Sequence, residues 1–323
     1  MKSISFTLIT LFCTFLLFSP EVKAIDAVAS FGKLDGNVQV LRESRKIPGR
    51  AGLILNDKDV VVTGRSSRVT IIFRDGSEIR LFEDTRFIIE RSQESTEGDR
   101  RFFYNFKLKL GSFWGRFSKG KQNTLIETPS ATIGIKGTNV AFSQTGGRLD
   151  IALSEGKVSV ENEDGSINLE PGYRLKGVSK HGDFKSKLSK MPYQVSIKPD
   201  NAKIKIPTPG EIEEIYFSIQ LIDSKTKQNY GKKGMVFISL DNDKLEFPEA
   251  IQLNKRGYAR IKAIIKPFQK VDYKNGQLEV FAVVGGKQSM NIAAGQTLLI
   301  YDVPQKIKRI IRVDMTTGNI GSH

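Results

Sequence analysis

The stretch Ser-Ser-Arg-Val-Thr-Ile-Ile-Phe-Arg-Asp-Gly-Ser-Glu-Ile-Arg-Leu, residues 66–81, decides the fold class. Every second residue from Val69 to Phe73 is apolar, which is the period of a half-buried strand. The dipeptide Asp75-Gly76 then predicts a tight type I′ turn, because that turn needs positive φ at both central residues. Alternation resumes after the turn, so the stretch predicts a β-hairpin.

The same pattern runs along the rest of the chain. Asp164-Gly165 and Asn275-Gly276 each separate two alternating runs, and a further run places every second residue from Phe102 to Leu110 on one apolar face. No convincing amphipathic helix longer than about three turns is present after the first 24 residues. The sequence therefore predicts an all-β fold.

The first 24 residues have the layout of a secretory signal peptide. A basic start at Met1-Lys2 precedes an apolar run over residues 4–18, and Ala24 ends a segment suited to signal peptidase. The run is about fifteen residues, shorter than the roughly twenty needed to span a bilayer. We expect cleavage after Ala24 and a periplasmic or secreted mature chain with no membrane span.

The chain is strongly basic, with 50 Lys and Arg against 35 Asp and Glu and a formal net charge of +15. Such an excess predicts an acidic partner. Because an exported chain does not normally meet DNA or RNA, we expect an envelope polyanion or an envelope protein and no nucleic acid. The single Cys and two His exclude a zinc site of the Cys/His type and a disulfide framework.

Composition along the chain divides it into two domains. Residues 25–178 form a first β domain, and residues 179–193 are polar, Lys-rich and without strand alternation, as in a linker. Residues 194–303 carry short strands at the spacing of an Ig-like β-sandwich. Residues 304–323 form either a basic tail or an edge strand, and the sequence does not choose between them.

Blocks from residue 36 onward resemble the bacterial FecR-domain family. Gly-Asn-Val-Gln-Val (36–40), Gly-Leu-Ile-Leu-Asn-Asp-Lys-Asp-Val-Val-Val-Thr-Gly (52–64), the hairpin at 66–81 and Glu-Thr-Pro-Ser-Ala-Thr-Ile-Gly-Ile-Lys-Gly-Thr-Asn-Val (127–140) follow the order of the family's motifs. Asn56-Asp57 stands where the family more often has Gly-Asp. The resemblance implies a solenoid-like β wrap that serves as an extracytoplasmic binding module.

The best-known members of that family also carry a cytoplasmic anti-sigma segment and a membrane helix, and they respond to an outer-membrane receptor. Only Met1-Lys2-Ser3 precedes the hydrophobic segment here, so direct control of a sigma factor is not expected.

Several motif residues have a structural explanation that needs no ligand. Glycines permit positive φ or close backbone approach, proline begins an edge or a corner, and threonine hydrogen-bonds to nearby backbone. We assign such roles to Asp75, Gly76, Thr128, Pro129, Gly134, Gly137 and Thr138.

The segment from Arg100 to Lys121 mixes cations with aromatic residues and contains no acid. A basic strand face with aromatic neighbours can hold a glycan by ring stacking and its acidic groups by charge. The candidate surface comprises Arg100, Arg101, Lys107, Lys109, Trp114 and Arg116. A strand with an aromatic core face and a solvated cationic face explains the same residues and is the preferred interpretation.

Catalytic, metal-binding and cofactor motifs are weak or missing. His181 lies in the expected linker, where nothing would hold it as a catalytic base, and Asp241-Asn-Asp243 lacks the Gly and distal Glu of a calcium loop. We therefore predict a non-enzymatic protein that binds or scaffolds at the cell envelope without a cofactor. A signalling partner of an outer-membrane receptor and an envelope glycan hydrolase, which would need two converging carboxylates, are the alternatives.

Overall fold

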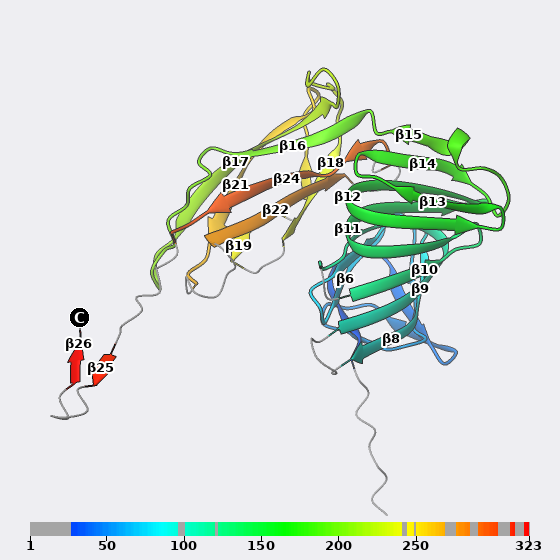
Figure 1. Cartoon of the computed structure of the whole chain (residues 1–323), viewed down its shortest axis with the longest axis horizontal. Coiled ribbons are helices and arrows are strands. Elements are labelled where there is room, and N and C mark those ends of the chain that lie inside the picture. The colour runs from blue at the N-terminus through cyan, green and yellow to red at the C-terminus, as the bar shows by residue number, and fades with distance from the viewer. Residues whose placement is uncertain are drawn as a thin grey trace, which may run out of the picture.

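A computed structural model describes residues 27–95, 101–119, 122–240, 244–248, 250–268, 276–284, 290–302, 311–313 and 320–322. The expected signal peptide and residues Asp241 to Asp243 lie outside these ranges. The all-β prediction is confirmed, because the described residues form strands and one short 3₁₀ turn. Figure 1 shows two β units side by side, the first drawn in blue to green and the second in yellow-green to orange.

The first unit is one sheet of fifteen strands. In chain order its strands are β1 (Ala29–Asp35), β2 (Val38–Arg42), β3 (Arg45–Pro48), β4 (Ile54–Leu55), β5 (Val60–Thr63), β6 (Arg68–Phe73), β7 (Glu78–Leu81), β8 (Arg86–Ser95), β9 (Arg101–Arg116), β10 (Gln122–Glu127), β11 (Thr132–Thr145), β12 (Arg148–Asn162), β13 (Gly165–Leu169), β14 (Tyr173–Val178) and β15 (Leu188–Lys190).

The sheet wraps around one apolar core. Alternate residues of strands far apart in the sequence meet there, such as Phe31 of β1, Phe106 of β9 and Ile151 of β12, all buried. Strands β9 and β10 run parallel, with Phe102 opposite Gln122, whereas the flanking pairs β8–β9 and β11–β12 are antiparallel. Inward residues of period two thus supply the burial that stabilises the domain.

The first hairpin forms where expected but with a different turn. Gly76 has φ +82°, whereas Asp75 is not among the residues with positive φ, so the predicted type I′ turn is wrong. Gly76 N–H donates to Phe73 O at 3.0 Å, and Phe73 N–H donates to Ser77 O at 2.9 Å. This is the longer loop with one glycine in the left-handed region, which also joins twisted antiparallel strands.

The predicted apolar face of β9 ends one residue early. Phe102, Tyr104, Phe106 and Leu108 are buried as expected, but Leu110 is 48% exposed. The pairing of β8 with β9 shifts register here, and Gly111 has φ +96°. A Cβ on Gly111 would lie 2.4 Å from Thr85 Cα, so only glycine fits this bulge. Beyond it, odd-numbered residues such as Phe113 face the core.

The second unit is a β-sandwich. One sheet has the order β19-β21-β17-β16-β23 and the other β20-β18-β22-β24. The strands are β16 (Tyr193–Pro199), β17 (Glu213–Asp223), β18 (Met235–Leu240), β19 (Leu245–Glu246), β20 (Ala250–Gln252), β21 (Tyr258–Ile265), β22 (Gln277–Val284), β23 (Ile292–Ala293) and β24 (Gly295–Ile300). A separate core between the sheets includes Phe217, Val236 and Leu278. In the tail, β25 (Ile311–Val313) pairs with β26 (Ile320–Ser322).

The segment expected to be a linker, residues 179–193, contains regular structure. The 3₁₀ turn η1 (Lys185–Lys187) leads into β15, which pairs with β14 at the edge of the first sheet. Met191 follows and is 3% exposed, and β16 of the sandwich already begins at Tyr193. The polar sequence hid this strand because an edge strand exposes most of its side chains.

Candidate functional site

The predicted cationic surface divides along β9. Arg100 and the side chain of Arg101 lie outside the described residues. Lys107 forms ion pairs with Glu90 at 3.5 Å and Glu127 at 3.4 Å, and Lys109 is exposed.

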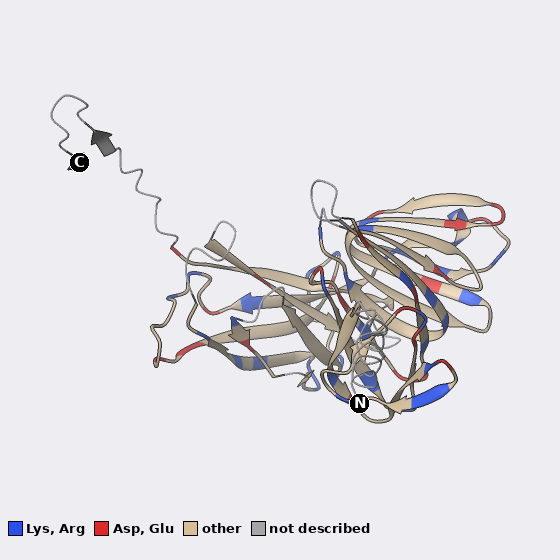
Figure 2. Ribbon diagram, turned by 90° about the horizontal axis from the view of Figure 1, so that it is seen from below, with Lys and Arg blue, Asp and Glu red and all other residues tan. Residues whose placement is uncertain are grey.

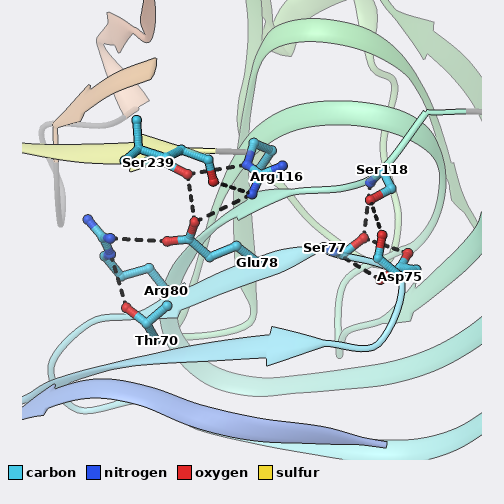
Figure 3. Close-up of polar contacts among 9 residues, drawn as sticks. Thr70, Asp75, Ser77, Glu78, Arg80, Arg116, Ser118 and Ser239 are labelled. Atoms are coloured by element: carbon cyan, nitrogen blue, oxygen red, sulfur yellow. Dashed lines mark hydrogen bonds and ion pairs between the residues drawn. The ribbon is translucent and has the colours of Figure 1, made fainter. Parts of the chain in front are cut away.

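Trp114 and Arg116 lie beyond the bulge and face the second domain. Trp114 is 2% exposed, so its ring is covered rather than open to a ligand. Arg116 donates through Nη2 to Leu240 O at 2.8 Å and through Nε to Ser239 Oγ at 3.3 Å, both in β18 (Figure 3). These two predicted binding residues therefore belong to a contact between the domains, which we call the joint.

A buried carboxylate organises the joint. Glu78 of β7 accepts from Ser239 Oγ at 2.6 Å and from Arg80 Nη2 at 3.0 Å, and Arg116 Nη2 lies 3.8 Å from its Oε2 (Figure 3). The Glu78 side chain is 11% exposed and that of Arg80 is 9%. Charges so far from water need partners: Glu78 has the three just named and Arg80 has Glu78 and Thr70, while Arg80 Nη1 is buried without a hydrogen-bond partner.

An apolar contact surrounds this polar cluster. Phe237 of β18 lies 5.0 Å from the Arg80 guanidinium and 5.5 Å from that of Arg68, measured to its ring centre. Its ring also lies 6.2 Å from the ring of Phe82. The cluster of buried residues in the joint comprises Phe82, Trp114, Ala141, Ala152, Met191, Phe237, Val283 and Met290. The second domain is thus packed on the outer face of the first.

The joint continues where the chain passes from the first unit to the second. Arg174 of β14 donates to Met290 O at 3.2 Å and to Asn291 Oδ1. Ala294 N–H donates to Ser154 Oγ of β12 at 2.9 Å. Contacts along the second half of β18 and on both sides of β23 fix the orientation of the sandwich, because a rotation about one of these places would break the contacts at the other.

A groove of about 670 Å³ lies on the outer face of β8 to β13, the strands stacked one above another in Figure 1. Three cations line it: Arg91 of β8, Lys136 of β11 and Lys157 of β12. All three are exposed, and within the described residues none forms an ion pair. The volume lies within the range of about 300–1,000 Å³ typical of ligand sites.

Amides and exposed apolar side chains complete the groove. Phe103 of β9 is 39% exposed and Leu125 of β10 is 40% exposed, although both lie in the middle of strands. Glu170 is the one carboxylate among the residues that line it. The amide side chains are those of Gln93, Asn105, Asn123 and Asn168.

Charged side chains beside one end of the groove pair with one another. Glu90 accepts from Lys58 Nζ at 2.5 Å, and this hydrogen bond, with Lys107, keeps the pKa of Glu90 below its usual value. Burial alone would lower the pKa of Lys107, but Glu127 and Glu90 outweigh it and raise that pKa. Acids at this end are neutralised, so the groove itself keeps its positive charge.

The strands that form the groove match a known protein family. Residues 59–159 match the family described as FecR protein, which includes β8 to β11 and most of β12. These residues form a FecR domain. The resemblance found in the sequence is therefore confirmed, and the groove lies within or beside the matched segment.

Solved structures give a weaker likeness. Two crystal structures of a putative anti-sigma factor from Parabacteroides distasonis ATCC 8503, at 1.65 and 2.50 Å resolution, align with 14% and 13% identity and a TM-score of 0.33 each. Each alignment covers 41% of this chain and 58% of the solved chain. No curated protein matches the chain. Among the described residues, no helix is long and apolar enough to cross a bilayer.

Most of the FecR motif residues have structural positions. Asp75 accepts from Ser77 N–H at 2.9 Å and from Ser77 Oγ at 2.7 Å through its carboxylate, and its carbonyl accepts from Ser118 Oγ at 2.7 Å (Figure 3). Thr128 Oγ1 accepts from the N–H groups of Ser130 and Ala131 in the corner after β10, where Pro129 is exposed.

The glycines and Thr138 act at the next corner. Gly137 has φ +55° at a bulge of β11, and its carbonyl lies 2.2 Å from where a Cβ of Gly156 would be. Gly134 lies in the groove floor opposite Ser159, whose Oγ would lie 2.6 Å from an added Cβ. Thr138 Oγ1 is buried without a hydrogen-bond partner, so its expected bond to the backbone is wrong.

Several cations outside the groove form ion pairs. Figure 2 shows Lys and Arg on both domains, interspersed with Asp and Glu. On the sandwich, Lys262 pairs with Glu214 at 2.7 Å, Lys266 with Glu246 at 3.5 Å, and Arg260 with Asp200. These acids are distant in sequence, so the ion pairs of the Lys- and Arg-rich stretch around β21 cannot be seen in the sequence alone.

His181 of the expected linker lies at the surface beside Asp164. His181 Nδ1 lies 3.3 Å from Asp164 Oδ1, and both side chains are exposed. The hydrogen bond from Gly182 N–H, with that of His181, lowers the pKa of Asp164. Among the described residues, no group of three or more His, Cys, Asp or Glu side chains is placed to hold a metal ion.

Proposed function

We propose that this protein is a non-enzymatic component of the bacterial cell envelope that binds an anionic envelope polymer or protein through its FecR domain. The groove supports this most directly, because three exposed cations without ion pairs line one concave surface of that domain. A charge that faces open space is available to a partner, whereas a charge in an ion pair is not.

The joint supports a scaffolding role. Because Glu78, Arg116 and Phe237 connect the domains through buried contacts, the sandwich holds the FecR domain in one orientation. A partner bound to either domain is then presented in a fixed geometry relative to the other.

Fractionation of cells tests the proposal. We expect the mature chain to begin at Ile25, to occur in the periplasmic or secreted fraction, and to sediment with envelope preparations at low salt. Raising the salt from about 0.05 to about 0.5 M should release it, because screening then acts over shorter distances. A native chain that begins at Met1 and fractionates with ribosomes or chromosome would contradict the proposal.

A second candidate function is a relay for the ligand state of an outer-membrane receptor. The FecR match favours it, because the best-known family members work in this way. Affinity capture of the full chain from membranes should then recover one specific outer-membrane barrel protein, and recovery should survive salt that removes polyanions. The glycan hydrolase alternative gains no support, since the groove is lined by one carboxylate and the reaction needs two.

A further inference from the structure

We propose that the groove of the FecR domain is a binding site for an acidic polysaccharide. This names the ligand class of the site invoked above, and it depends on the proposed function only for where the ligand is encountered. The placement of the cations, an apolar platform, the amides and the full pairing of the floor strands each support this ligand class.

Two lysines form a like-charge pair in the groove. Lys136 of β11 and Lys157 of β12 are direct cross-strand partners, so both side chains leave the same face of the sheet from Cβ atoms about 5 Å apart. Like charges directly opposite each other destabilise a sheet. Within the described residues, neither Lys is relieved by an ion pair, and Glu170, which lines the same groove, forms none with them. An anionic group seated between the two lysines removes the repulsion.

Two exposed apolar side chains form a platform in the groove. Phe103 and Leu125 come from the neighbouring strands β9 and β10 and are diagonal neighbours two residues apart in register, because Phe103 pairs with Asn123 and Leu125 with Asn105. Each keeps about two fifths of its surface exposed. A sugar ring offers a face of C–H groups that packs on such a surface, and an aromatic ring adds to that contact.

Amide side chains lie beside the platform. Gln93 pairs with Phe103, and Asn168 pairs with Ser159, so exposed amides lie at both sides of the groove with Asn123 between them. An amide both donates and accepts hydrogen bonds. Neighbouring hydroxyl groups of a sugar need both, whereas a simple anion needs donors alone.

The pairing of the strands distinguishes a glycan from an acidic peptide as the ligand. A peptide recognised as an added strand needs an unpaired strand edge. The floor strands β9, β10, β11 and β12 are each paired on both sides, so their backbone groups are already used. Of the strands that line the groove, β13 pairs with β12 alone, but the four floor strands offer side chains and no open edge, which favours the glycan.

Binding of labelled polygalacturonate to the full chain at low salt is the test. Dextran serves as the uncharged glycan and poly-glutamate as the acidic peptide. We expect polygalacturonate to bind and the other two to bind at least about tenfold more weakly, since each lacks one of the two features that the groove recognises. Equal binding of dextran, equal or tighter binding of poly-glutamate, or no binding of polygalacturonate would overturn the proposal.

Variants locate the site. The double variant Lys136→Gln/Lys157→Gln should weaken polygalacturonate binding about tenfold, because two charge-assisted contacts are lost. The matched control is Lys46→Gln/Lys176→Gln, which removes two exposed lysines of the same domain outside the groove and should change affinity less than about twofold. Equal losses in both variants would show that net charge alone attracts the polymer, and the site would be refuted.

Two further measurements keep this site separate from the proposed function. The groove variant should unfold at the same or a higher temperature than the native chain, since the cross-strand repulsion is gone; a lower temperature would contradict the like-charge argument. If the chain sediments with envelopes and the groove variant does so equally, the site fails and the proposed function stands. If polygalacturonate binds at the groove but the chain is not exported, the reverse holds.

Discussion

The joint and the groove lie on the same outer face of one sheet, yet their charged side chains are arranged in opposite ways. In the joint, Glu78 contacts two guanidinium groups and a hydroxyl of the second domain. In the groove, Lys136 and Lys157 face each other without an anion. Charges in the joint are thus neutralised by ion pairs and by contacts with the second domain. In the groove the two lysines have no such partner among the described residues.

Glycine bulges separate the two regions. Strands β9, β11 and β12 run through both, and each carries a glycine with positive φ between them: Gly111, Gly137 and Gly156. Each bulge shifts which residues face outward, so Phe103 and Trp114 lie on the same face although one is odd-numbered and the other even-numbered. One strand can therefore supply a ligand surface at one end and a domain contact at the other.

The largest expected difference between the regions concerns aromatic side chains. Phe237→Ala in the joint should cost about 3–5 kcal/mol of the free energy that holds the domains together, because a buried ring leaves a cavity. Phe103→Ala in the groove should change stability by less than about 1 kcal/mol, since Phe103 is already 39% exposed.

Trp114, the single tryptophan, reports the result, because it is buried in the joint. Its emission should shift to longer wavelength in Phe237→Ala and stay unchanged in Phe103→Ala. Equal unfolding midpoints and unchanged emission in both variants would show that the joint is not a stable contact in solution.

Carboxylates give the second contrast. Glu78→Gln should cost about 3 kcal/mol, since two poorly solvated guanidinium groups lose their counter-charge while the packing is kept. Glu170→Gln, its counterpart in the groove, should change stability by less than about 0.5 kcal/mol, because its carboxylate is exposed and forms no ion pair in the described structure. Urea unfolding followed by Trp114 emission measures both, and similar losses would mean that the two regions do not differ in their charge environment.

Much of the fold was predictable from local sequence. Period-two runs gave the strands around Val69, Phe106 and Leu278, and the family motifs gave the first domain. Local sequence also predicted the buried face of β9 up to Leu108. These successes share one cause, since the alternation of side chains in a strand is visible in the sequence itself.

The candidate site was predicted only in part. Sequence singles out the segment around β9, but it could not show that Trp114 would be buried in the joint or that Lys107 would pair with Glu90. Nor could it show that Lys136 lies opposite Lys157, because register depends on the bulge at Gly137. The signal that could have warned of the change is Gly111, a glycine inside an otherwise continuous strand pattern.

The smallest expected effect concerns the compensated end of the groove. The pKa of Glu90 is lowered in the folded chain by Lys58 and Lys107, so its ionised form stabilises the fold at pH values above the unfolded pKa of about 4.3. That contribution is lost as the pH falls through the lowered folded pKa. Glu90→Gln should therefore cost about 0.5 kcal/mol near neutral pH, because exposed pairs contribute little, and nothing once both states are protonated.

Urea unfolding of the native chain and of Glu90→Gln, compared at about pH 7 and about pH 2.5, measures this difference. The expected result is a gap that closes in acid, because protonated Glu90 and Gln are then equivalent in charge. A gap of the same size at both pH values would assign the loss to packing. A gap as large as that of Glu78→Gln would show that the charges beside the groove are as strongly held as those of the joint, and the contrast between the two regions would not stand.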